Sequence, residues 1–125
     1  MTKTEALHKF WSGFGIPFFA SGSVPTGTQA PSMPYGTYEV RTSAFGGSSV
    51  AAAVNLWYRT TRNVEPNAKA EEISKAIGYS GVTIDCDDGI IWIKRGDPWC
   101  TATTDNSENT VKRRILNVMY DFITM

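Results

Sequence analysis

Residues 85–100, DCDDGIIWIKRGDPWC, contain four aspartates and two cysteines within sixteen positions, and these residue types can hold a metal ion or supply a thiol nucleophile. A calcium loop of the EF-hand type needs glycine at its sixth position and glutamate at its twelfth. Counted from Asp85, these positions are Ile90 and Gly96. A zinc site needs four nitrogen or sulfur ligands at recognisable spacing, and the chain has one histidine and two cysteines. The sequence therefore predicts no metal site.

Nucleophilic catalysis finds little support in the residue pattern. A thiol site would have to combine His8 with Cys86 or Cys100, and no signature stretch surrounds either cysteine. The carboxylates at 71–72 and at 87–88 are neighbours in sequence, so on a helix or in a turn their side chains point apart. We predict no catalytic residue and no cofactor, and we expect both thiols to be reduced.

A β-hairpin accounts for the same residues directly. The runs VTIDC (82–86) and IIWIK (90–94) are rich in residues that favour strands, and they are separated by Asp-Asp-Gly. We therefore predict antiparallel pairing across a turn at 87–89, with Gly89 at a positive φ. Of the nearby tryptophans, Trp92 is predicted to lie in the core.

Apolar spacing predicts the elements that surround this hairpin. A helix is expected at residues 2–14, and a second within 63–81 with Gly78 just past its last turn. Strands are expected at 16–20, 35–45 and 49–60. Residues 111–125 also fit a helix face, but their content of Val, Ile, Tyr, Phe and Thr favours a strand. The polar segments 21–34 and 95–110 are predicted to be long loops.

Composition and charge limit the classes of function. The 125 residues are enough for one domain, 1–125, with a single core. Twelve basic residues balance twelve acidic ones, so the chain lacks the basic excess of proteins that bind nucleic acid through its phosphates. No stretch of about 18 apolar residues is present, and the start of the chain does not have the layout of a signal peptide. We expect a soluble protein that is not exported and has no membrane partner.

Long loops in a small domain without catalytic residues suggest contacts with other chains. Aromatic and arginine side chains dominate the energy of such contacts. The residues of this kind in and beside the second predicted loop are our candidates for a subunit interface: Arg95, Trp99, Arg113 and Arg114.

Four segments, taken in order, resemble the tail terminator proteins of long-tailed bacteriophages and related prophages. They are WYRT (57–60), EIS..IG (72–78), DGIIWIKRGDPW (88–99) and RRILNVMYDF (113–122), and with their spacing they cover about two-thirds of the chain. The resemblance implies an α+β subunit: a twisted, mostly antiparallel sheet of about six strands with two helices packed against it.

The resemblance also implies a function without catalysis or cofactor. Such subunits form a hexameric ring at the head-proximal end of the tail tube, where the ring stops polymerisation of the tube protein and presents a surface to the head-side connector. DNA only passes through the ring, and the protein belongs to the virion after assembly in the host cytoplasm. The alternatives are a head-closure or neck connector protein and, less favoured, a small thiol-dependent enzyme that uses Cys100.

Overall fold

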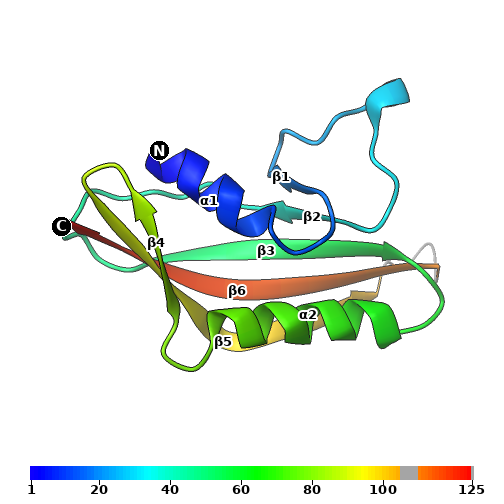
Figure 1. Cartoon of the computed structure of the whole chain (residues 1–125). Coiled ribbons are helices and arrows are strands. Elements are labelled where there is room, and N and C mark those ends of the chain that lie inside the picture. The colour runs from blue at the N-terminus through cyan, green and yellow to red at the C-terminus, as the bar shows by residue number, and fades with distance from the viewer. Residues whose placement is uncertain (105–109, 125) are drawn as a thin grey trace.

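The computed structural model describes residues 1–104 and 110–124, which form one curled six-stranded sheet with two α-helices on the same face (Figure 1). The order of strands in the sheet is β1-β2-β3-β6-β5-β4, and only the β1–β2 pair is parallel. The elements are α1 (Lys3–Trp11), β1 (Phe18–Ala20), a 3-10 turn η1 (Gly27–Gln29), β2 (Tyr35–Tyr38), β3 (Val50–Arg59), α2 (Val64–Ile77), β4 (Val82–Cys86), β5 (Gly89–Thr104) and β6 (Val111–Thr124). The predicted α+β fold is confirmed.

Helix α1 begins at a capping box. The hydroxyl of Thr2 accepts a hydrogen bond from the backbone N–H of Glu5, and the Glu5 carboxylate accepts one from the N–H of Thr2. The helix ends at Trp11, three residues before the predicted end, because glycines follow and Gly15 has a φ of 82°. Trp11 is fully buried, and its indole N–H donates to the Tyr120 hydroxyl on β6 at 3.0 Å.

Helix α2 follows the predicted pattern closely. Its buried stripe includes Ala70, Ile73 and Ile77, and the helix ends before Gly78, whose φ of 76° only glycine adopts readily. Because both helices bury their stripes against the same sheet face, the molecule has one core.

The two central strands show the alternation that the sequence predicts. Alternate residues of β3 from Ala52 to Tyr58 are buried, as are alternate residues of β6 from Leu116 to Phe122. The strands pair over ten residues in antiparallel register. The strand interpretation of residues 111–125 is therefore confirmed over Val111–Thr124. No helix among the described residues lies on the other face of these strands.

The β4–β5 hairpin is confirmed, but the reason given for its glycine is wrong. Ile84 pairs with Ile91 and Cys86 pairs with Gly89, so the turn consists of two residues. The positive φ, 67°, belongs to Asp88, and Gly89 has none. What requires glycine at position 89 is space, since a Cβ there would overlap the Ile123 carbonyl oxygen and the Phe45 ring.

Three other predictions need correction. The strand expected at 35–45 ends at Tyr38, because the N–H of Ala53 bonds to the Glu39 carboxylate instead of continuing the ladder. The loop expected at 95–110 is wrong for its first ten residues, which belong to β5; residues 105–109 lie outside the described part. Trp92 is half-buried on the face without helices, where its indole N–H donates to the Ser80 carbonyl oxygen.

Candidate subunit interface around the β5 bulge

A large bulge interrupts the pairing of β5 with β6. Arg95 pairs with Val118 and Cys100 pairs with Leu116, so four residues of β5, 96–99, lie opposite Asn117 alone. The Asn117 amide donates to the Pro98 carbonyl oxygen at 2.8 Å. A Cβ on Gly96 would come within 2.9 Å of the Asn117 side chain, so glycine lets the two strands approach closely here.

The bulge brings Arg95 and Trp99 against helix α2. The Arg95 guanidinium donates from Nη1 to the Ser74 hydroxyl at 2.8 Å, and the Trp99 indole N–H donates to the Ala70 carbonyl oxygen at 3.3 Å. Trp99 is half-buried and packs against the hydrophobic core, whereas Arg95 is exposed. The Trp99 side chain therefore contributes to the fold as well as to the surface.

A depression of about 490 Å³ lies at this bulge. Its lining residues are Tyr79, Lys94, Arg95, Gly96, Asp97 and Trp99. Tyr79, which follows the glycine that ends α2, is 97% exposed, the highest value among the large hydrophobic residues that the surface presents. An exposed aromatic ring beside an arginine and a shallow depression is the composition typical of the centre of a protein interface.

Lys94 connects this depression to the face without helices. Its ammonium group forms an ion pair with Asp121 at 2.5 Å and lies 4.4 Å from the centre of the Trp92 ring. The hydrogen bond from Lys94, followed by one from the Ser49 hydroxyl, lowers the pKa of the Asp121 carboxyl. Because Lys94 is already paired, Arg95 is the cation of the depression that a partner can approach.

Arg113 and Arg114 are not part of this surface. They are adjacent in β6, so their side chains point to opposite faces of the sheet. The Arg113 guanidinium lies 4.9 Å from the Trp57 ring and donates to the Asn55 carboxamide at 2.9 Å, on the face without helices. Its predicted contact with another subunit stays a prediction.

Arg114 has a role inside the subunit. It is 4% exposed, and it donates to the carboxamide oxygens of Asn67 and Asn63, at 3.0 and 2.9 Å, at the start of α2. Burial leaves this guanidinium no surface to offer to a partner, so the prediction that places Arg114 in an interface needs correction. Strand alternation places Arg114 on the same face as Leu116 and Val118, but it cannot show that α2 begins over this position.

The two cysteines lie far apart. Cys100 is paired with Leu116, whereas Cys86 lies beside Gly89, which is paired with Thr124. The two partner residues on β6, Leu116 and Thr124, are eight positions apart, which corresponds to about 27 Å along the strand. Both thiols are half-buried, and burial raises the pKa of each, so each thiol is less nucleophilic at neutral pH.

His8 is exposed, and its Nδ1 lies 2.8 Å from the Tyr38 hydroxyl. Within residues 1–104 and 110–124, no group of three or more His, Cys, Asp or Glu side chains could hold a metal ion. No helix in the same part of the chain is long and apolar enough to cross a membrane.

Tyr79 and the bulge are the features of the candidate interface that the sequence analysis did not identify. Glycine and proline inside a strand are typical of a bulge, so the Gly-Asp-Pro at 96–98 was the available signal. Searches of protein-family models, of curated proteins and of solved structures found no match to this chain.

Proposed function

We propose that the chain is the tail terminator subunit of a long-tailed phage or prophage. In this role six copies close as a ring on the head-proximal end of the tail tube, stop its polymerisation and present a surface to the head-side connector. The observation that carries the proposal is the ordered set of four segments at 57–60, 72–78, 88–99 and 113–122 that resemble this family.

The places of these segments in the fold support the proposal. They lie at the end of β3, in the second half of α2, from the β4–β5 turn to the bulge, and along β6. Strands β3, β6 and β5 are neighbours in the sheet, and α2 contacts all three. The segments that carry the resemblance thus fold as one connected unit, which favours a common structural origin over chance similarity of short pieces.

The surface chemistry also supports a ring subunit. The depression at the bulge offers Tyr79 and Arg95 to a partner, and no other described residue covers the Tyr79 ring. The balanced charge of the chain suits a ring through which DNA passes without being held.

The experiment that tests the proposal is deletion of the gene in the phage or prophage that encodes it. Tails of uncontrolled length that fail to join heads are the expected result, and a second copy of the gene, expressed while tails assemble, should restore normal length. Tails of normal length that join heads would contradict the proposal.

The alternatives give different results in the same preparation. A head-closure or neck connector protein would purify with heads, and its loss would leave the length of the tails normal. A thiol-dependent enzyme would lose turnover in the Cys86→Ser/Cys100→Ser variant, whereas a tail terminator with these substitutions should still assemble.

A further inference from the structure

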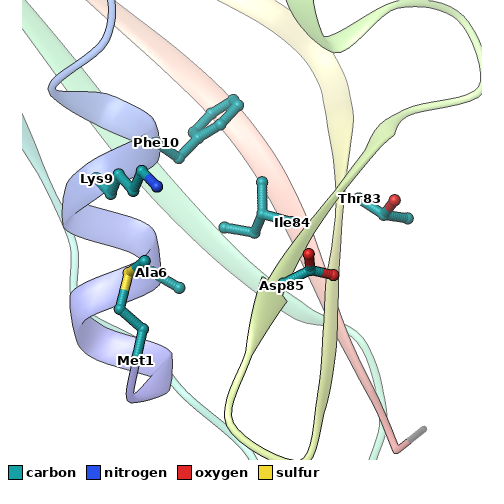
Figure 2. A pocket seen from close by; sticks show the side chains of 7 residues that line it. All are labelled: Met1, Ala6, Lys9, Phe10, Thr83, Ile84 and Asp85. Carbon is teal, nitrogen blue, oxygen red and sulfur yellow. The ribbon is translucent and has the colours of Figure 1, made fainter.

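A groove lies between helix α1 and the edge strand β4. Its volume is about 440 Å³; Ala6, Lys9 and Phe10 line one side, and Thr83, Ile84 and Asp85 line the other. Figure 2 shows the Phe10 and Ile84 side chains facing each other across this space. One end is bounded by the start of the chain, where the Met1 carbonyl oxygen accepts a hydrogen bond from the N–H of Asp87 at 2.6 Å.

The backbone of β4 is available on the side of this groove. Strand β4 is last in the sheet order, so among the described residues β5 is its only strand partner. None of the remaining described backbone hydrogen bonds involves residues 82–86. An edge with unpaired N–H and C=O groups beside a partly apolar groove is the arrangement in which a sheet accepts an extended segment of another chain.

A second segment of the chain does not pack against the core of its own subunit. Residues 21–34, which we call the arm, connect β1 to β2 and extend away from the sheet (Figure 1). No arm residue belongs to the described hydrophobic core or packs against it, and residues 24–34 form no hydrogen bond with described residues outside the arm. The apolar side chains of Val24 and Met33 are half-buried, but neither packs against the hydrophobic core of its own subunit.

The chemistry of the arm matches the groove. The arm has no charged residue, and the charges that line the groove, those of Lys9 and Asp85, are opposite in sign. Pro25 and Pro31 fix their own φ angles and disfavour helical backbone at the residues before them, which reduces the entropy that is lost when the arm binds. Half of the arm, about seven residues, can span roughly 24 Å when extended, enough to cross a subunit boundary.

We propose that the arm of one subunit lies along the β4 edge of a second copy, with Val24 or Met33 inserted between Phe10 and Ile84. The arm leaves the sheet at its β1–β2 edge and the groove lies at the opposite edge, β4. Because the arm and the groove lie on opposite edges of the sheet, contacts between copies run head to tail. Such contacts close into a ring when the rotation that relates neighbouring copies allows it. The inference rests on the ring form of the proposed function, and it names the contact that joins neighbouring subunits.

Disulfide cross-linking tests the contact directly. In a Cys86→Ser/Cys100→Ser background, Thr28→Cys places a thiol in the arm and Thr83→Cys places one on β4, both at exposed positions. Oxidation of the double variant should give a ladder of covalent oligomers on a denaturing gel, because each chain has one thiol in the arm and one on β4 and can therefore be linked to two neighbours. The matched control joins Thr28→Cys with Lys75→Cys on the exposed side of α2, and it should give no product larger than a dimer.

Deletion of residues 26–30 provides a second measurement. It leaves Val24 and Met33 in the chain but shortens the arm that must carry them to the neighbouring groove, so it should raise the protein concentration at which rings form by roughly tenfold or more and leave the melting temperature unchanged. Amide exchange of residues 21–33 in the intact chain should slow on assembly, and in the deletion variant exchange at the β4 edge should not slow.

The outcomes separate this inference from the proposed function. A chain that caps tails but gives no ladder, or gives only a cross-linked monomer, overturns the arm contact and leaves the terminator function in place. A ladder from a chain that does not cap tails supports the arm contact and removes the terminator function.

Discussion

Two adjacent arginines of β6 show how much the environment of a side chain decides its role. Arg114 is buried beneath the start of α2, between two asparagines, and Arg113 lies on Trp57 at the surface of the other face. In the sequence, Arg113 and Arg114 are simply two adjacent basic residues. Strand alternation places them on opposite faces of the sheet, and α2 covers only the face that holds Arg114.

We expect Arg114→Ala to lower the free energy of unfolding by about 2–4 kcal/mol, because two buried carboxamide oxygens lose a charged donor and the aliphatic stem leaves a cavity. The matched variant Arg113→Ala should cost about 1 kcal/mol or less, since its contacts are at the surface. Urea denaturation followed by circular dichroism measures both. Equal losses in the two variants would contradict the burial argument.

Asp121 gives a prediction about pH. Its pKa in the folded chain is lowered from 3.8, first by the hydrogen bond from Lys94 and then by that from Ser49. The carboxylate therefore stabilises the fold at pH values above its unfolded pKa, and this contribution is lost as the pH falls through the lower folded pKa. Asp121→Asn should be less stable than the parent at pH 7, and the two stabilities should converge below about pH 4. Thermal melts at pH 3 and pH 7 compare them, and a gap of constant size would contradict the assignment.

At the scale of the elements, the tight turn between β4 and β5 was predicted correctly, but the reason given for Gly89 was wrong. An Asp-Gly pair between two strand-forming runs predicts a tight turn, and the turn is present. The pattern cannot show which residue has the positive φ, nor that β6 and Phe45 pack against the second strand at its first residue. Those contacts come from segments about 35–45 residues away in the chain.

We expect Gly89→Ala to destabilise the domain by about 1–3 kcal/mol, because the new Cβ forces the Ile123 backbone and the Phe45 ring to move. Gly13→Ala is the control, since its Cβ would lie 3.4 Å from the nearest atom, an ordinary contact. The midpoint of urea denaturation measures the difference. A loss for Gly89→Ala no larger than that for Gly13→Ala would contradict the argument that space requires glycine at position 89.

The helices and central strands could be predicted from the sequence because their periodicity is a local property. The alternation in β3 and the stripe of α2 each follow from burial of one face. The second half of β5 could not be predicted from the sequence, because Gly96 and Pro98 are typical of loops. The bulge that accommodates them depends on Asn117 in the neighbouring strand β6. Arg95 and Trp99 could be named as interface candidates from the sequence, and that interface stays a prediction, whereas Tyr79 has no pattern that distinguishes it from an ordinary surface residue.

At the scale of the whole molecule, the depression at the bulge is where we expect a partner to bind. Tyr79→Ala and Arg95→Ala should each weaken capping of tails roughly tenfold or more without lowering the melting temperature by more than a few degrees. Trp99→Ala should weaken both capping and stability, because the indole also contacts α2. Lys75→Ala, an exposed change on the same helix, is the control. Capping is measured by the length distribution of tails, and unchanged lengths in both Tyr79 and Arg95 variants would exclude this surface.

The order of the strands has a consequence for biosynthesis. Strand β6 comes last along the chain, yet it lies between β3 and β5 at the centre of the sheet. While the ribosome is still making this strand, β3 and β5 have no neighbour on their inner edges, and the apolar face that α1 and α2 cover remains incomplete. We therefore expect the domain to fold only after β6 has left the exit tunnel, with the β4–β5 hairpin formed early and the pairing of residues about 70 positions apart, such as Val50 with Tyr120, formed last.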